Sequence, residues 1–241
     1  MLGTLLNAVG ILLGGLAGAN PRWQLSASRQ SFLKAALGVF TFYAGARLVW
    51  MGWTGGFLHG LAQFGIVLLA MSAGKILGGL LGLQKLSNAV GQFAKDRLNG
   101  PAPPQSRGSD GFTVCAGLFC AAPLAIYGAL QEGLQNNWHL LAIKAVMDGL
   151  AAMAFVPLFG RMVLLSVLPV VAWQGLLTLG ARVLVEFSLI PVPSHPLDSL
   201  NMTCGVLAFG VALVVFEVKK IELADYLPSL ALAPLLTAWW L

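Results

Sequence analysis

Long apolar runs separated by short polar segments make up most of the chain. Seven of these runs are predicted to be membrane-spanning helices, at residues 2–19, 32–51, 57–83, 112–130, 140–159, 162–185 and 200–216. A span needs roughly 20 predominantly apolar residues. An eighth run, 224–241, is interrupted by Pro228 and Pro234, so a re-entrant or surface segment is the alternative there. The pattern predicts an all-α integral membrane protein with about eight transmembrane helices, or seven if the last run does not span.

The longest polar segment, residues 84–111, is predicted to be a cytoplasmic linker. It begins with an amphipathic piece around Leu86, Val90 and Phe93, and it continues into a proline-rich stretch at 100–106 with a composition typical of linkers. This segment is the best internal boundary. The predicted divisions are 1–83, 84–111, 112–185 and a remainder of outer loop and carboxy-terminal helices, 186–241.

The composition excludes a soluble protein. Hydrophobic residues make up 58% and charged residues 10% of the 241 positions, and the mean hydropathy is +0.82, whereas soluble domains carry about 25% charged residues. The net charge of +5 does not indicate a nucleic-acid partner, because the basic residues are spread over the loops and form no patch or helical stripe. The lipid bilayer is therefore the expected partner.

The distribution of basic residues predicts the orientation, because cytoplasmic loops are rich in lysine and arginine. With the amino terminus outside, the outer ends of the spans hold only Arg47 and Arg182. The chain begins directly with an apolar run and has no basic segment before it, which favours a retained first span over a cleaved signal peptide. The inner loops then hold Arg22, Arg29, Lys34, Lys85, Lys95, Arg97, Arg107, Arg161, Lys219 and Lys220.

Two ionisable residues, Lys144 and Asp148, lie inside the apolar run at 140–159. Their spacing puts them on one helix face, and Asp148 lies near mid-depth of a hydrocarbon core about 30 Å thick. Charges in a bilayer are costly and usually mark a functional site, here a site for ion coupling or for substrate contact. The alternative is a self-neutralising pair that fixes helix packing. Lysine before aspartate is the less favourable order for such a pair, which leaves a partner on another helix open for Asp148.

Five more polar residues lie in or at the end of predicted spans. Gln63, Gln174 and Asn7 lie deep enough to hydrogen-bond between helices, either as structural contacts or as ligand contacts. Gln131 and Glu132 close the run at 112–130 at the outer face, as an entrance group or as an ordinary solvated helix end. The predicted substrate or ion pathway comprises Asp148, Lys144, Gln174, Gln63, Gln131, Glu132 and Asn7.

Glycines recur every four residues in two of the predicted spans. Such stripes let helix backbones approach closely in lipid. They predict tight packing, either within the chain or between the subunits of a homo-oligomer. The residues are Gly10, Gly14 and Gly18 in the first run, and Gly74, Gly78 and Gly82 in the third.

A weak internal repeat has an offset of 110 residues. It aligns residues 34–38 with 144–148 and Gly65 with Gly175. Since each unit would have three spans, the second unit must be inverted relative to the first, which is a common plan of secondary transporters. The predicted architecture is therefore two inverted three-helix repeats and a carboxy-terminal helical hairpin.

No residues form a recognisable catalytic, metal or cofactor motif in the sequence. Cys115, Cys120 and Cys204 fall in apolar runs and are interpreted as packing residues. The three histidines lie at predicted loop edges without a second ligand at helical spacing. We therefore expect neither an enzyme nor a bound cofactor or metal.

Several segments together resemble the DUF554 family of bacterial membrane proteins. They are residues 3–7 with Gly14-Gly15, residues 119–133, Lys144 with Asp148-Gly149, residues 174–179, and residues 219–221 with Leu227-Pro228. The resemblance covers nearly the whole chain and implies a bacterial inner-membrane protein of seven or eight spans, but it implies no chemistry. Two acids typical of the family are absent, because Gly78-Gly79 and Asn201 stand in their places, so no ion-binding role of those acids carries over.

The leading functional hypothesis is a transporter or channel for a small solute or ion, with a polar site near the membrane midplane between the repeats. The alternative is a non-transporting scaffold or partner subunit whose buried polar residues serve only helix packing.

Overall fold

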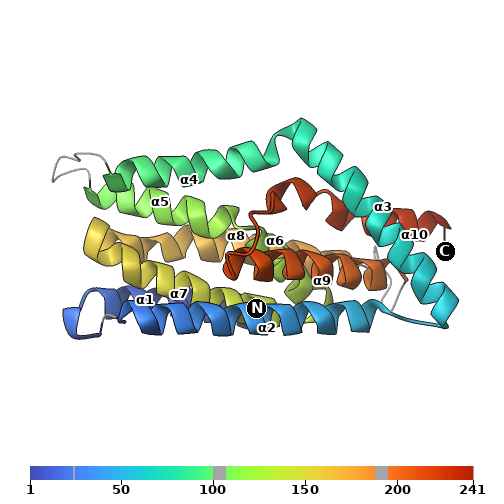
Figure 1. Cartoon of the computed structure of the whole chain (residues 1–241), viewed down its shortest axis with the longest axis horizontal. Coiled ribbons are helices and arrows are strands. Elements are labelled where there is room, and N and C mark those ends of the chain that lie inside the picture. The colour runs from blue at the N-terminus through green and yellow to red at the C-terminus, as the bar shows by residue number, and fades with distance from the viewer. Residues whose placement is uncertain (24, 100–106, 188–194, 241) are drawn as a thin grey trace. The chain divides into compact units, whose positions relative to one another are not determined.

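The computed structural model describes residues 1–23, 25–99, 107–187 and 195–240. Every regular element in these ranges is a helix (Figure 1), which confirms the all-α class. The α-helices are α1 (Leu2–Gly18), α2 (Ala27–Gly52), α3 (Phe57–Leu81), α4 (Leu83–Asn99), α5 (Arg107–Ala121), α6 (Pro123–Gln135), α7 (His139–Phe159), α8 (Val167–Glu186), α9 (His195–Val215) and α10 (Ser229–Trp240). Short 3-10 helices precede α2, α8 and α10: η1 (Pro21–Trp23), η2 (Arg161–Ser166) and η3 (Leu223–Tyr226).

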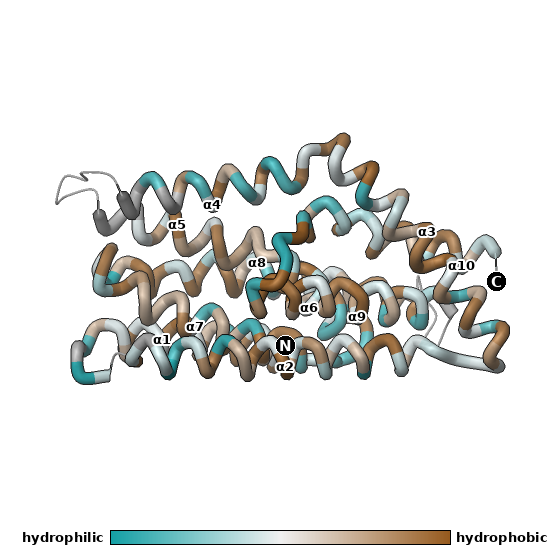
Figure 2. Tube along the Cα trace, viewed as in Figure 1, coloured by the Kyte–Doolittle hydropathy of each residue, from teal (hydrophilic) through white to brown (hydrophobic). Residues whose placement is uncertain are grey.

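Hydrophobic residues occur along most of the helices (Figure 2), and many of the large ones are exposed, as expected for contact with lipid. Within the described residues, five helical segments are long and apolar enough to cross a membrane, and the count is six when α5 and α6 are taken as one broken span. Helix α1 is apolar but shorter, at 17 residues. Helix α10 has only 12 residues, fewer than the roughly 20 that a span requires.

The run at 112–130 was predicted to be one helix, and the structure shows two. Helices α5 and α6 meet at an angle of 56°. Ala122 between them has extended backbone (φ −61°, ψ 126°), and Pro123 occupies the first position of α6. Proline lacks an N–H and its ring clashes with the preceding turn, so it starts a new helix more readily than it continues one.

The predicted amphipathic piece of the linker is part of α4. The proline-rich stretch at 100–106 lies outside the described residues, and so does most of a second proline-rich stretch, 190–196, in the predicted outer loop. Helix α9 begins at His195, five residues before the predicted start of that run at 200.

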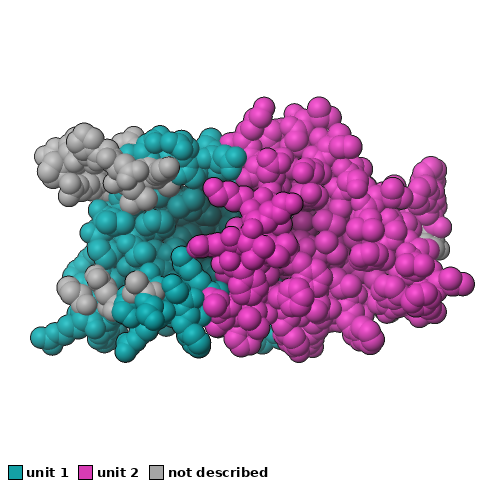
Figure 3. Space-filling model, in the orientation of Figure 1, with its two compact units in different colours: residues 1–34, 87–182 teal, residues 35–86, 183–241 magenta. Residues whose placement is uncertain are grey.

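The chain forms two compact units, residues 1–34 with 87–182 and residues 35–86 with 183–241 (Figure 3). We call them unit 1 and unit 2. Each unit contains helices from both halves of the chain. The boundaries of the two units therefore differ from the predicted ranges 1–83 and 112–185. The inverted repeat is a statement about sequence symmetry and stays a prediction.

In unit 1, α1 lies directly against α7 through its glycines. A Cβ added to Gly10, Gly14 or Gly18 would collide with the carbonyl oxygens of Ala145, Gly149 and Met153, respectively. The offset is 135 residues at each contact, so the two helices run in the same direction. The stripe predicted in the first run therefore packs within the chain. Beside it lies an apolar core of Ile11, Val114, Cys115, Phe119, Ala152, Val156, Phe159, Val163 and Val170.

In unit 2, α3 packs on η3 and α10 through the second stripe. A Cβ on Gly74 would lie 2.8 Å from the Cβ of Ser229, and one on Gly78 would collide with the carbonyl oxygen of Asp225. Gly82 has a different role: it adopts the left-handed conformation (φ 68°) that ends α3, a backbone state that glycine reaches without strain.

Candidate functional site

An ion pair lies buried in unit 1 on helix α7. Lys144 Nζ donates a hydrogen bond of 2.6 Å to Asp148 Oδ2, and the two residues are only 1% and 7% exposed. The predicted i,i+4 contact is therefore present despite its less favourable order. At such burial each charge depends on the other, because a lone charge would lose its hydration without compensation.

A pair of amide side chains lies beside the ion pair. Asn7 Nδ2 of α1 donates a hydrogen bond of 3.2 Å to Gln174 Oε1 of α8, and both residues are 0% exposed. The Asn7 side chain also lies near the Asp148 carboxylate of α7. Three helices thus bring together four of the seven predicted pathway residues, Asn7, Lys144, Asp148 and Gln174, which we call the polar cluster.

Two atoms of the polar cluster are buried without a hydrogen-bond partner among the described residues. They are Asn7 Oδ1, an acceptor, and Gln174 Nε2, a donor. A buried polar atom left unpaired costs about 1–3 kcal/mol, and nearly all such atoms in folded proteins are satisfied by protein, water or ligand. The cluster therefore offers one donor and one acceptor to a small hydrogen-bonding molecule.

The break between α5 and α6 lies close to the ion pair. Lys144 Nζ is 5.9 Å from the centroid of the Phe119 ring, and Phe119 belongs to the last turn of α5. The last four carbonyl groups of a helix lack intrahelical partners, and this end of the helix dipole favours cations. The Lys144 ammonium thus lies near a natural binding place for positive charge.

Glu132 has a structural role that the sequence did not indicate. Its carboxylate accepts hydrogen bonds from Gly3 N (2.5 Å), Thr4 N (3.3 Å) and Thr4 Oγ1 (3.1 Å), and the residue is 3% exposed. It caps the first turn of α1, where unpaired N–H groups and the helix dipole favour an anion. The interpretation as a solvated helix end is wrong for this residue.

The other two predicted pathway residues hydrogen-bond to residues outside the polar cluster. Gln131 is buried next to Glu132, and its Oε1 accepts a hydrogen bond of 3.4 Å from Asn137 Nδ2. Gln63 belongs to unit 2, where its Nε2 donates to Ser199 Oγ at 3.3 Å. Ser199 Oγ is in turn 2.5 Å from Thr237 Oγ1. These two hydroxyl residues were not singled out in the sequence, although hydroxyls in apolar runs are candidates for contacts between helices.

A second buried carboxylate also caps a helix. Asp225 Oδ1 accepts a hydrogen bond of 2.8 Å from Gln84 N at the start of α4, and Gln84 Oε1 accepts one of 3.1 Å from Ala224 N. This reciprocal pair fixes η3 to the turn after α3 within unit 2. In the ranges that the structure describes, no group of three or more His, Cys, Asp or Glu is placed to hold a metal ion.

Comparison with known proteins agrees with the all-helical membrane architecture. The model of a family described as "Protein of unknown function (DUF554)" matches residues 2–238. The chain is 22% identical over 235 residues to "Uncharacterized membrane protein YdfK" of Bacillus subtilis (strain 168), with 97% of this chain and 94% of the relative covered. It is 25% identical over 242 residues to "Uncharacterized protein YqgA" of Escherichia coli (strain K12), with coverage of 100% and 97%. No solved structure matches the chain.

Proposed function

The chain belongs to the DUF554 family, whose function is unknown, and we propose that it is a transporter or channel for a small solute or ion. The site of this activity is the polar cluster of Asn7, Lys144, Asp148 and Gln174. The chain is a membrane protein by its helices and by its likeness to a named membrane protein. We place it in the bacterial inner membrane, with the amino-terminal end of α1 outside, because that orientation puts most lysines and arginines on the inner side.

The observation that carries the proposal is a buried donor and a buried acceptor that lack partners next to a buried ion pair. A cluster that served packing alone would gain stability by pairing these atoms or by replacing them with apolar groups. Gln174 Nε2 and Asn7 Oδ1 instead remain available for hydrogen bonds with a solute. Intramembrane ionisable groups beside such atoms are typical of substrate and ion pathways.

The broken span supports the same proposal. Discontinuous helices line the binding sites of many transporters, because their ends supply unpaired backbone groups and dipole ends inside the membrane. Irregular backbone at membrane depth is tolerated where protein or water covers it. The ring of Phe119, in the last turn of α5, has its centroid 5.9 Å from Lys144 Nζ, so a side chain from the broken span reaches the ion pair.

The cluster can treat neutral and charged solutes differently. A neutral solute with a carbonyl and an N–H or O–H group can bond to Gln174 Nε2 and Asn7 Oδ1 and leave the ion pair intact. A cation must displace Lys144 from Asp148 Oδ2, and an anion must displace Asp148 from Lys144 Nζ. Opening of the pair by an ion would couple its passage to a local rearrangement of α7.

The proposal is tested by flux into proteoliposomes that contain the purified chain. A panel of inorganic ions, protons and small amides or amino acids is offered under defined gradients. For any ion that the wild type moves, we expect the double variant K144M/D148N to lower flux by about tenfold or more, the effect of losing roughly 1.4 kcal/mol of site interaction. The variant D96N, which makes the same aspartate-to-asparagine change at the exposed Asp96 of α4, should leave flux unchanged. Full flux in the double variant would place the pathway elsewhere.

A non-transporting scaffold or partner subunit is the second candidate, and one observation favours it. Lys144 and Asp148 neutralise each other at 2.6 Å, as expected for a pair that only stabilises packing. The candidates differ in whether aqueous reagents reach the cluster. In a background without native cysteines, a pathway predicts that Q174C reacts with a small methanethiosulfonate cation and that a transported solute slows the reaction. A scaffold predicts no reaction in the folded protein.

A further inference from the structure

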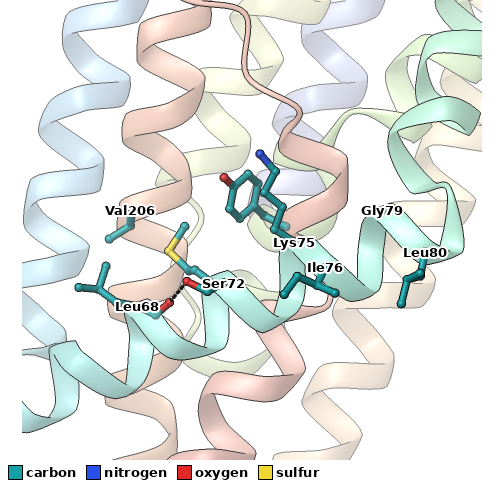
Figure 4. A pocket seen from close by; sticks show the side chains of 9 residues that line it. Leu68, Ser72, Lys75, Ile76, Gly79, Leu80 and Val206 are labelled. Carbon is teal, nitrogen blue, oxygen red and sulfur yellow. Dashed lines mark hydrogen bonds between the residues drawn. The ribbon is translucent and has the colours of Figure 1, made fainter.

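A groove with a cavity of about 860 Å³ opens on the surface of unit 2 (Figure 4), whereas the polar cluster belongs to unit 1. One face of α3 forms most of it, and α9 and η3 contribute one residue each. The lining residues are Leu68, Met71, Ser72, Lys75, Ile76, Gly79 and Leu80 of α3, Val206 of α9 and Tyr226 of η3.

Helix α3 has two different faces, and this difference creates the groove. One stripe (Gln63, Val67, Ala70, Gly74 and Gly78) is buried. On the other face, Leu68, Ile76 and Leu80 are 47%, 66% and 79% exposed. Gly79 leaves space on the groove side, because a Cβ added there would meet only Asp225 Oδ2, at 4.0 Å.

The apolar wall of the groove fits a hydrocarbon chain. Helix α3 is one of the helices long and apolar enough to span a membrane, so its exposed leucine and isoleucine side chains contact acyl chains. The ridge formed by residues 68, 72, 76 and 80 follows the helix at i,i+4 spacing. Ser72 does not interrupt it with an unpaired polar group, because its Oγ donates to the Leu68 carbonyl oxygen at 2.9 Å (Figure 4).

Lys75 lies in this apolar groove, and its positive charge is only weakly neutralised by the acids around it. Lys75 lies six residues before the end of α3, or about 9 Å along the helix. Its Nζ is 5.5 Å from the centroid of the Tyr226 ring and 4.0 Å from Glu222 Oε2, with both side chains about half or more exposed (49% and 62%). Exposed ion pairs at that distance contribute little, so the ammonium keeps donors for a stronger anion such as phosphate.

Three more lysines lie in unit 2 next to η3 and the start of α4. Lys85 follows Gln84, which is bonded to Asp225, and Lys219 and Lys220 precede η3; all three are exposed. Of the acids nearby, Asp225 is buried against the start of α4, while Glu217 and Glu222 are exposed. Basic residues next to a membrane-spanning helix attract anionic lipid headgroups.

From this combination we propose that the groove is a binding site for an anionic phospholipid. One acyl chain lies along residues 68, 72, 76 and 80, and the phosphate faces the Lys75 ammonium over the Tyr226 ring. The site is independent of the polar cluster and of any transport activity.

The proposal is tested on the purified full chain in detergent by native mass spectrometry and by thermal unfolding with added lipid. Phosphatidylglycerol and phosphatidylcholine with identical acyl chains are compared. We expect phosphatidylglycerol to bind about fivefold more tightly, the preference that one lysine confers for an anionic lipid. K75Q should remove this preference, whereas K219Q, which removes an equal charge outside the groove lining, should keep it.

A shape variant tests the acyl-chain contact separately from the charge. G79F fills the groove where a side chain has room, and it should weaken both lipids while leaving unfolding without lipid unchanged. Soluble glycerol 3-phosphate has the anion but no acyl chain and should not compete. Equal binding of both lipids by the wild type, an unchanged preference in K75Q, or competition by glycerol 3-phosphate would each overturn the proposal.

Discussion

At the scale of single residues, buried carboxylates perform two kinds of work in this protein. Glu132 and Asp225 cap the first turns of α1 and α4, so their charge is satisfied by backbone N–H groups. Asp148 instead accepts a hydrogen bond from the Lys144 side chain. A carboxylate held by backbone donors at a helix start, two for Glu132 and one for Asp225, has a fixed structural role, whereas one held by a side chain can change its partner. This contrast singles out Asp148 among the three.

The dependence of Lys144 on Asp148 predicts strong coupling between substitutions at the two positions. D148N leaves the buried ammonium without its counter-charge and should destabilise the protein by about 3–5 kcal/mol. K144M/D148N removes both charges, keeps most of the volume, and should recover most of that loss. The measurement is a double-mutant cycle by thermal or denaturant unfolding in detergent, with D96N as the exposed control. Additive effects of the two substitutions would show that the pair is not coupled.

At the scale of helices, backbone contact through small residues organises the packing in unit 1. Helix α1 approaches α7 so closely that carbonyl oxygens occupy the places of missing side chains at three successive turns. This approach also brings Asn7 next to the carboxylate of Asp148. The glycine stripe therefore positions the polar cluster as well as the helices.

A methyl group added to this contact has a predictable cost. G14A directs a Cβ at the carbonyl oxygen of Gly149, a backbone atom that cannot rotate away, and overpacking of this kind costs about 1–3 kcal/mol. G65A and G180A are the matched controls, since a Cβ at either position has no neighbour within 4 Å. The controls should be neutral or more stable by up to about 1 kcal/mol, because alanine favours helix. Thermal unfolding of the three variants tests this prediction. An equal loss of stability in all three would contradict the close contact between Gly14 and Gly149.

At the scale of the whole molecule, the sequence predicts patterns that repeat along one helix and misses contacts that join several helices. The apolar runs, the glycine stripe of α1 and the Lys144–Asp148 contact are all local patterns, and each has its counterpart in the structure. The bond between Asn7 and Gln174 joins residues 167 positions apart, and the cap of Glu132 on α1 spans 129. No periodicity encodes such contacts.

The break at Ala122 was missed for a different reason. Pro123 is visible in the sequence, but proline in a membrane helix is compatible with a kink as well as with a break. The choice depends on whether neighbouring groups satisfy the freed backbone, which is a tertiary property. The carboxy-terminal run depends on the same property: helix α10 begins directly after Pro228, whereas Pro234 lies inside the helix without ending it.

The direction of α1 and α7 constrains the topology of the whole chain. Because the two helices run parallel, the chain must cross the membrane an even number of times between the start of α1 and the start of α7. Crossings by α1, α2, α3 and the broken pair α5–α6 satisfy this condition, whereas a re-entrant α5–α6 would not. The residues that follow α1 and α7, Arg22 and Arg161, should therefore lie on one side of the membrane, and the turn after α2 on the other.

Single cysteines in a background without Cys115, Cys120 and Cys204 test this topology. R22C and R161C should react with a membrane-impermeant maleimide only after the cells are permeabilised, since the proposed orientation puts the basic loops inside. G56C, in the exposed turn between α2 and α3, should react in intact cells and serves as the outer control. If positions 22 and 161 are labelled from opposite sides of the membrane, the single crossing by α5–α6 is contradicted. If both are labelled in intact cells while G56C is protected, the orientation is the reverse of the proposed one and the number of crossings is unchanged.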